Sequence, residues 1–243
     1  MARVFITGST AGLGKAAART LLEEGHEAVV HARSAERRKA VDDLIERGAA
    51  VVVGDLSDQE QARSVARQVN RLGRMDAVIH NAGVISGPQM FAINVIAPYL
   101  LTVLIERPAR LVYLSSSMHG GGRADLTAFD RAGRGGQGSY ADTKLLLTAL
   151  AFAVARIWNG VFSNAVDPGW VPTRMGGPSA TDDLRLGHLT QVWLATSEDL
   201  DACTSGGYWY HRHRAEPAPV VEDRRFQDDL VDGLARFTGE RVL

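Results

Sequence analysis

The sequence has little cysteine, no excess of either charge and no long hydrophobic run, and each absence excludes a class of protein. With a single cysteine, Cys203, the 243-residue chain forms no intramolecular disulfide, and no spacing of Cys and His is typical of a zinc site. The formal net charge is −1, so the chain has no basic field for nucleic acid or anionic lipid. No apolar run reaches the roughly 18 residues of a membrane span. We therefore expect a soluble cytoplasmic protein with no metal, no nucleic acid and no membrane span, whose partners are small molecules.

Short apolar runs alternate along the chain with stretches of helical periodicity. The expected strands are residues 3–7, 28–32, 50–53, 77–80, 110–115 and 162–166. The expected helices are residues 15–24, 36–47, 58–72, 93–105 and 139–158. Because each connection is long enough for a helical crossover, these strands are expected to run parallel. The predicted fold is therefore α/β, a Rossmann-type doubly wound parallel sheet with helices on both faces, in one domain over residues 1–243.

Two segments show no periodic pattern, namely residues 119–138, which are rich in Gly, Arg and Asp, and residues 172–183. In a doubly wound sheet, the ligand binds at the carboxyl ends of the strands. We expect both segments to be loops above that edge, where loops that contact a substrate lie.

A glycine-rich segment, Thr7-Gly-Ser-Thr-Ala-Gly-Leu-Gly14, follows the first expected strand and precedes the first expected helix. Glycines at such a turn let the pyrophosphate of a dinucleotide approach the backbone and bind the N-terminal amides of the helix. Taken alone, the segment is weak evidence, because a tight strand-to-helix turn without a ligand is the alternative explanation. It therefore indicates a cofactor site only in combination with other motifs.

Tyr140 and Lys144 stand four residues apart in the last expected helix, so both side chains lie on one face. The Lys144 ammonium is expected to favour the ionised Tyr140 phenol and so to lower its pKa. Lowering a phenol pKa from near 10 by roughly 3 units requires about 4 kcal/mol of differential stabilisation. Such a pair is a proton-transfer group, and beside a hydride carrier it indicates redox chemistry between alcohols and carbonyls. In isolation, a surface Tyr and Lys on a helix would be the simpler interpretation.

Further short motifs lie at or near the ends of the other expected strands. They are Asp55-Leu56, Asn81-Ala-Gly83, Asn94, Ser115-Ser116 and Asp167-Pro-Gly169. Together with Thr7-Gly-x-x-x-Gly-x-Gly14 and Tyr140-x-x-x-Lys144, this set resembles the short-chain dehydrogenase/reductase family in its single-domain form. The resemblance covers nearly the full chain and implies a nicotinamide-dependent oxidoreductase.

The resemblance also implies catalytic roles. Tyr140 would be the general acid in carbonyl reduction and the general base in alcohol oxidation, with Lys144 and the positive nicotinamide ring lowering its pKa. Lys144 would also hydrogen-bond the nicotinamide ribose. Ser116, the second of a pair that ends the fifth strand, would hydrogen-bond the carbonyl oxygen, with Ser117 as the fallback. Asn94 would hold a water that links Lys144 to solvent, and helix packing is the alternative role.

The end of the second expected strand indicates the cofactor. Ala32 stands where an NAD-type Asp is expected, and Arg33 follows with a guanidinium suited to a 2′-phosphate, so NADP(H) is preferred over NAD(H). The alternative is a solvated Arg33 that opens the next helix. By resemblance, Asp55 would bind the adenine amino group. The complete set of expected cofactor-binding residues is Thr7, Gly8, Ser9, Thr10, Gly12, Leu13, Gly14, Arg33, Ser34, Asp55, Leu56, Asn81, Ala82, Gly83, Tyr140, Lys144, Pro168, Gly169, Val171 and Thr173.

Two spacings depart from those common in the family. From Ser116 to Tyr140 the gap is 140 − 116 = 24 residues, longer than is common. With Ser-Ser-x-x-His, which ends at His119, and Ser205-Gly-Gly-Tyr-Trp, this gap is similar to the retinol-dehydrogenase-like branch, which acts on lipophilic alcohols and carbonyls. From Asn81 to Asn94 the gap is 94 − 81 = 13 residues, shorter than is common, so this loop must be compact. His119 itself is expected to be a loop residue and not a catalyst.

We expect an NADP(H)-dependent carbonyl reductase or alcohol dehydrogenase for an apolar ketone or aldehyde, with Trp170 and Met175 as an apolar wall of the substrate site. An NADP(H)-binding redox sensor without turnover is one alternative, although the Tyr, Lys and Ser that such a protein would lack are all present. A nucleotide-sugar epimerase shares Tyr-x-x-x-Lys, but such chains usually have a different glycine spacing and are longer. Family members often pair through the helices that hold Asn94 and Tyr140, so a homodimer or homotetramer is possible.

Overall fold

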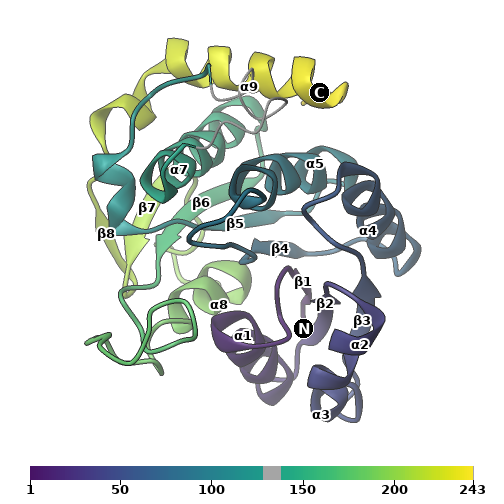
Figure 1. Cartoon of the computed structure of the whole chain (residues 1–243). Helices are drawn as coiled ribbons and strands as arrows, with labels where there is room; N and C mark the ends of the chain where they lie inside the picture. Colours follow the sequence, from purple (N-terminus) through teal and green to yellow (C-terminus); the bar gives the residue numbers. More distant parts are fainter. Residues whose placement is uncertain (128–137, 243) are drawn as a thin grey trace.

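The computed structural model describes residues 1–127 and 138–242, and its centre is one eight-stranded sheet with helices on both faces (Figure 1). The strand order is β3-β2-β1-β4-β5-β6-β7-β8, in which β1 to β7 are parallel and β8 pairs antiparallel with β7. The strands are β1 Arg3–Ile6, β2 Glu27–Ala32, β3 Ala50–Val53, β4 Ala77–His80, β5 Arg110–Leu114, β6 Phe162–Asp167, β7 Gly207–Tyr210 and β8 His213–Ala215. This sheet confirms the predicted doubly wound α/β fold.

The helices form two layers because successive residues of the central strands point to opposite faces of the sheet. The α-helices are α1 Gly12–Glu23, α2 Ala35–Arg38, α3 Asp42–Ile45, α4 Gln59–Arg71, α5 Ala97–Leu104, α7 Tyr140–Ile157, α8 Leu189–Thr196 and α9 Arg224–Thr238. Phe5 packs into the layer that contains α4, α5, α7 and α9, whereas Val4 and Ile6 pack into the layer that contains α1, α3 and α8. Of the helices in the described part of the chain, none is both long and apolar enough to cross a membrane.

The prediction of six strands was wrong, because the structure adds β7 and β8 at one edge of the sheet. β7 reads Gly-Tyr-Trp-Tyr, without the aliphatic run that marks the other short strands, and it gains its place by pairing with β6. β7 turns into β8 through His211 and Arg212, both with the left-handed φ that tight hairpins require. The unpredicted helix α8 lies between β6 and β7, so β7 reaches the sheet through a crossover of the usual kind.

Two predicted helices are also interrupted. The helix expected over residues 36–47 is α2, a one-turn 3₁₀ helix η1 (Lys39–Val41) and α3, and the break brings Val41 and Leu44 into the core. The helix expected over residues 93–105 begins with a π-helical segment, η2 (Ala92–Ile96), before α5. Pro98 has no N–H to donate to the Asn94 carbonyl, so the α-helical hydrogen bond cannot form there. π-Helical turns of this kind are frequent at functional sites.

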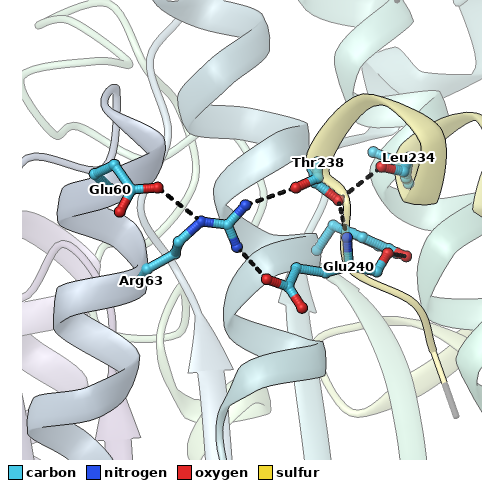
Figure 2. Close-up of polar contacts among 6 residues, drawn as sticks. Glu60, Arg63, Leu234, Thr238 and Glu240 are labelled. Atoms are coloured by element: carbon cyan, nitrogen blue, oxygen red, sulfur yellow. Dashed lines mark hydrogen bonds and ion pairs between the residues drawn. The ribbon is translucent and has the colours of Figure 1, made fainter.

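The C-terminal segment is fastened to the layer of α4, α5, α7 and α9. Helix α9 packs on α7, and the residues that follow it reach α4 and α5 (Figure 1). Arg63 on α4 donates to the Thr238 carbonyl and to the Glu240 carboxylate, and it also pairs with Glu60, as Figure 2 shows. The Tyr99 hydroxyl of α5 donates to the Glu240 carbonyl at 2.8 Å.

Candidate active site

A pocket of about 570 Å³ lies at the carboxyl ends of the central strands, where a doubly wound sheet binds its ligand. It extends from Arg33 and Arg37, after β2, to Tyr140 and Met175. The expected site residues that line it are Gly8, Thr10, Gly12, Leu13, Arg33, Asp55, Leu56, Asn81, Ala82, Gly83, Tyr140, Lys144, Pro168 and Thr173. The other expected residues lie behind this wall or beside it: Thr7, Ser9, Gly14, Ser34, Asn94, Ser116, Gly169 and Val171.

The glycine-rich loop leaves its backbone open to the pocket. Gly8 has a φ of +65°, and a Cβ added there would lie 2.8 Å from the Ala82 Cα, so only glycine fits. Gly12, at the start of α1, has a φ of +55° and lines the pocket. Its N-cap residue is Ala11, which has no side chain that could bond the free N–H groups of the first turn. These amides can therefore bind an anion.

Several expected cofactor residues hold the loop in place: Thr7 and Gly14 lie behind the pocket wall, and Asn81 also lines the pocket. The Thr7 hydroxyl accepts hydrogen bonds from the backbone N–H groups of Asn81 and Ala82, each at 2.9 Å. The Asn81 side chain donates to the Thr7 carbonyl at 2.8 Å. Gly14 packs against the same two loops, because a Cβ there would lie 2.8 Å from the Gly8 carbonyl oxygen. These contacts join the ends of β1 and β4, from which the pocket wall is built.

His31 on β2 lines the pocket and is a functional position that sequence reasoning missed. The Gly8 N–H donates to His31 Nδ1 at 3.0 Å, so the ring proton is on Nε2, which donates to the Gly54 carbonyl at 2.8 Å. Burial lowers the pKa of His31, which keeps the ring neutral and the Nδ1 acceptor available. The Ser9 hydroxyl accepts from the His31 backbone N–H at 2.7 Å. The signal by which the sequence could have indicated this role is a single histidine within an apolar strand.

The end of the pocket after β2 is positively charged. Arg33 is exposed, and Arg37, one helical turn later, lines the same pocket. The sequence analysis did not identify Arg37, although its i,i+4 spacing from Arg33 could have. Ser34 caps α2 by accepting from the Arg37 N–H, and its hydroxyl donates to the Glu36 carboxylate at 2.6 Å. The Ser34 side chain is therefore engaged within its own turn, beside one negative charge.

On the adenine side expected from the resemblance, Asp55 and Leu56 follow β3. The Asp55 carboxylate accepts from the Ser57 N–H at 2.9 Å, and Leu56 is buried in the core while still reaching the pocket. The turn at Ser57 therefore orients the Asp55 side chain.

The three consecutive serines after β5 have different surroundings. Ser115 is buried, and its hydroxyl bonds to the Thr148 hydroxyl at 2.6 Å. Ser116 is partly exposed, and its side chain lies near enough to the Tyr140 phenol to lower the pKa of that phenol. Ser117 is exposed and begins the 3₁₀ helix η3 (Ser117–Gly121). Ser115 lines the pocket and Ser116 interacts with the phenol, so the role of Ser116 at the carbonyl oxygen stays a prediction.

The expected lowering of the Tyr140 pKa by Lys144 is wrong for the protein without cofactor. Burial raises the pKa of Tyr140 to about 12, the negative charge of Asp167 acts in the same direction, and the hydrogen bond with Ser116 opposes them. The Lys144 Nζ lies 5.5 Å from the centre of the Tyr140 ring and donates to the Leu114 carbonyl. Burial lowers the pKa of Lys144 itself to about 8, while Asp167 opposes that change.

Asn94 is buried in the π-helical segment η2 and closes the short loop after Asn81. Its side-chain amide accepts from the Val84 N–H and donates to the Val84 carbonyl, both at 2.9 Å, and it donates to the Thr143 hydroxyl. Gly83 separates it from Lys144, because a Cβ on Gly83 would lie 3.4 Å from Asn94 Oδ1 and 3.6 Å from Lys144 Nζ. The short spacing from Asn81 is therefore compatible with a closed loop, whose contacts position the backbone beside Lys144.

The long segment between Ser116 and Tyr140 leaves β5 through η3 and then contacts the first turn of α7; its residues 128–137 lie outside the described residues. Asp142 forms a capping box with Ser139 and also accepts from the Arg123 N–H at 2.8 Å. Gly122 lies against the same turn, because a Cβ there would meet the Ala141 carbonyl and Leu145. These contacts bring the end of η3 back to the helix that carries the phenol.

The segment after β6 covers the Tyr140 end of the pocket. Gly169 has a φ of +81° and turns the chain, Val171 is buried, and Pro168 and Thr173 face the pocket near the glycine-rich loop. Met175 places its sulfur 4.0 Å from the Tyr140 hydroxyl. Trp170 is 53% exposed, and its indole N–H donates to the Gly176 carbonyl at 2.9 Å.

Known proteins are similar to this chain in sequence. A sequence model of the family described as short chain dehydrogenase matches residues 2–104. The chain is 36% identical to the short-chain dehydrogenase chyC of Penicillium rubens, over 100% of this chain and 99% of that protein. It is 26% identical to retinol dehydrogenase 13 of Homo sapiens, over 97% of this chain and 84% of that protein. The chain therefore belongs to the short-chain dehydrogenase/reductase family of oxidoreductases, as its motifs predicted.

Solved structures share the fold. An uncharacterised protein from Mycobacterium paratuberculosis superposes with a TM-score of 0.82 at 21% identity, covering 99% of this chain and 94% of that chain. A blue fluorescent protein from a metagenomic library, solved in complex with NADPH, superposes with a TM-score of 0.70 at 22% identity, covering 86% of this chain and 95% of that chain. At these identities, the likeness shows the architecture only.

Proposed function

We propose that the protein is an NADP(H)-dependent oxidoreductase that reduces the carbonyl group of an apolar ketone or aldehyde. The observation that carries this proposal is one pocket with two chemically different ends. Two guanidinium groups, from Arg33 and Arg37, line one end, and a partly buried phenol from Tyr140 and a buried ammonium from Lys144 line the other. Cations suit the 2′-phosphate of a dinucleotide, and the Tyr-Lys pair suits proton transfer at the reacting end.

The residues along the pocket fit a dinucleotide phosphate. Gly8 leaves space where a Cβ would clash, and the uncapped first turn of α1 offers N–H groups to a pyrophosphate. Arg33 and Arg37 can share a 2′-phosphate, although the Glu36 carboxylate between them in sequence reduces the local positive charge. NADPH, when bound, would supply the hydride that the carbonyl carbon receives.

Tyr140 would supply the proton. With a pKa of about 12, its phenol is protonated at neutral pH, which is the form that carbonyl reduction requires. The phenol gives its proton to the carbonyl oxygen as that oxygen gains negative charge, so the products are an alcohol and a tyrosinate. Ser116 would donate a hydrogen bond to the same oxygen. Lys144 would stabilise the tyrosinate until the phenol regains a proton from solvent.

The surroundings of the Tyr140 end favour an apolar substrate. Met175 lies at the phenol, and Ile85, which also lines the pocket, is 50% exposed. Met118 and Trp170, in the segments that follow β5 and β6, are 52% and 53% exposed. Exposed apolar groups around a pocket mark a site for an apolar ligand more often than a free surface.

The proposal is tested by measuring the binding of NADPH and NADH by fluorescence, then the absorbance of the reduced nicotinamide with apolar ketones, aldehydes and quinones. We expect tighter binding of NADPH and its oxidation with one of these substrate classes. Tight binding without turnover on any of them would favour the redox-sensor alternative, and absence of binding would refute the cofactor assignment.

The preference for NADPH has its own test, Arg33→Asp. Charge-assisted hydrogen bonds are worth about 1.5–3 kcal/mol, so this change should weaken NADPH binding roughly 10- to 100-fold and leave NADH binding nearly unchanged. Arg38→Asp is the matched control, because Arg38 is exposed on α2 and is not among the residues that line the pocket. If both variants lower NADPH affinity equally, Arg33 does not contact the 2′-phosphate.

A further inference from the structure

His119 is buried beside Ser116 and connects it to a distant segment of the chain. Its backbone N–H and its ring Nδ1 both contact the Ser116 carbonyl oxygen, at 3.0 and 2.7 Å, and the side chain is 3% exposed. Its Nε2 accepts from the Ala218 N–H at 3.0 Å. Because Nε2 is an acceptor, the proton of the neutral ring is on Nδ1, which donates to Ser116.

The ring of His119 has rigid neighbours on its other sides. Ala218 directly precedes η4 (Pro219–Glu222), a one-turn helix that packs on α7, and α7 begins at Tyr140. The ring also packs against Tyr208 of β7, with 4.5 Å between the ring centres. The sheet, η4 and α7 therefore all restrict the position of the imidazole.

Ser116 depends on such support because it leaves the sheet at the start of a long excursion. It follows the last residue of β5 by two positions, and besides its interaction with the Tyr140 phenol its side chain makes a long capping contact with the Met118 N–H at 3.3 Å. A hydroxyl that must bond both the Tyr140 phenol and a substrate oxygen has to be placed accurately, since an error of 1 Å can cost about 100-fold in rate.

We propose that His119 is a positioning residue: by holding the Ser116 carbonyl, it fixes the Ser116 hydroxyl at the Tyr140 phenol. The inference rests on the proposed function, because it assigns Ser116 a place at the reacting oxygen. His119 touches none of the reacting atoms in this arrangement. Its effect would therefore be on kcat and not on cofactor affinity.

Two amide variants separate the two hydrogen bonds of the ring. In His119→Asn, the side-chain NH₂ can occupy the position of Nδ1 and donate to Ser116, while the bond from Ala218 is lost. In His119→Gln, the side-chain oxygen can occupy the position of Nε2 and accept from Ala218, while the bond to Ser116 is lost. Both variants lose the contact of the ring with Tyr208, so they form a matched pair. Ser116→Ala gives the reference for complete loss of the hydroxyl.

Steady-state kinetics with NADPH and an accepted substrate should show kcat of His119→Asn within about 3-fold of the wild type and kcat of His119→Gln at least about 10-fold lower. The NADPH dissociation constant and the melting temperature should be similar in the two variants. Equal kcat in both variants would overturn the proposal. A loss of kcat in His119→Gln that is matched by loss of NADPH binding and of melting temperature would also overturn it, because His119 would then support the fold alone.

An NMR experiment tests the positioning role of His119 without any turnover. If the wild-type protein turns over no substrate, the proposed function is refuted, but this experiment still tests the role of His119. The ¹³Cζ resonance of Tyr140, assigned with Tyr140→Phe, reports the hydrogen bond that the phenol shares with Ser116. Ser116→Ala and His119→Gln should shift this resonance in the same direction, and His119→Asn should leave it near the wild-type position. An unchanged resonance in His119→Gln would refute the positioning role.

Discussion

Residues 1–105, with β1 to β4, and residues 106–242, with β5 to β8, build their parts of the pocket in different ways. In the first region, Thr7 and Asn81 tie the ends of adjacent strands, and His31 ties the glycine-rich loop to the end of β3. In the second region, Ser116 and Tyr140 come from separate segments, which are brought together by contacts that span many residues.

This difference indicates that the substrate end of the pocket can vary independently of the cofactor end. In the first region, the pocket wall is formed by the backbone of neighbouring strands and their loops. A substitution in this region is therefore expected to disturb the whole cofactor end of the pocket. In the second region, loops form part of the pocket wall: Met175 lines the pocket, and Trp170 bonds the Gly176 carbonyl within the same segment. Loops on a rigid scaffold can change substrate preference without changing the fold.

The largest effect is expected from Tyr140→Phe, which removes the proton donor from the second region and leaves the first region unaltered. General acid catalysis contributes roughly 100- to 10,000-fold, so kcat should fall by about 1,000-fold, while the NADPH dissociation constant stays within about 3-fold. Tyr99→Phe is the control, because the Tyr99 hydroxyl bonds the C-terminal segment and not the pocket. Retention of more than a tenth of kcat in Tyr140→Phe would remove Tyr140 from the mechanism.

The complementary change is Gly8→Ala, which should damage the first region. The left-handed φ of +65° and the clash with Ala82 together should lower the free energy of unfolding by about 3 kcal/mol and abolish NADPH binding. Gly25→Ala is a matched control: Gly25 has a φ of +81° but no atom within 4 Å of an added Cβ, so only the strain of about 1 kcal/mol is expected. Denaturant titrations of both variants measure the difference, and equal destabilisation would show that the clash with Ala82 is relieved without cost.

The sequence predicted the first region well because its motifs are contiguous. The glycine run, Asp55-Leu56 and Asn81-Ala-Gly83 each follow a strand directly, so parallel strand order alone brings them to one edge. His31 and Arg37 were missed, since the first looks like one polar residue in an apolar strand and the second like a surface charge. Their roles depend on a loop that only the folded chain brings near.

The second region was harder to predict because its geometry is set by contacts across long stretches of chain. Tyr140-x-x-x-Lys144 was visible from helical spacing, whereas Ser116 was chosen among three consecutive serines only because the family resemblance implied the second of the pair. The direction of the Tyr140 pKa was not predictable, because it depends on how deeply the phenol is buried and on Asp167. His119 was expected to be a loop residue only, and its bond from Ala218 joins positions 99 residues apart.

An acid-dependent loss of stability should also arise in the first region. His80 on β4 is buried, donates to the Thr102 hydroxyl, and has a pKa lowered to about 3 by that burial. Below pH 6.5 the unfolded chain binds a proton that the folded chain excludes, so stability is complete above pH 6.5 and decreases as the pH falls towards 3. The expected slope is at most about 1.4 kcal/mol per pH unit, or about 2 kcal/mol between pH 6.5 and 5.

Urea titrations across this pH range check the effect. His80→Gln keeps a donor near the Thr102 hydroxyl but does not titrate, so its slope should be smaller than that of the wild type, with the buried His31 accounting for part of the remainder. His213→Gln is the control, since His213 is exposed on β8. An identical slope in His80→Gln and wild type would mean that His80 does not contribute.

The smallest effect is expected where the two regions are joined, at Arg63 on α4 (Figure 2). Its guanidinium is mostly shielded from solvent and binds the Thr238 carbonyl, at the end of α9, and the Glu240 carboxylate, two residues later. Arg63→Ala should therefore lower the free energy of unfolding by about 1–2 kcal/mol, because hydrogen bonds to charged groups are worth roughly that much and the carbonyl loses its partner. The NADPH dissociation constant and kcat should not change, since α4 lies on the side of the sheet away from the glycine-rich loop and α1.

Arg67→Ala, an exposed arginine one turn further along α4, should leave stability within about 0.5 kcal/mol of the wild type. If Arg63→Ala instead lowers kcat at unchanged stability, the C-terminal segment transmits its position through α9 and α7 to Tyr140, and the two regions are coupled more tightly than their separate hydrogen-bond networks indicate.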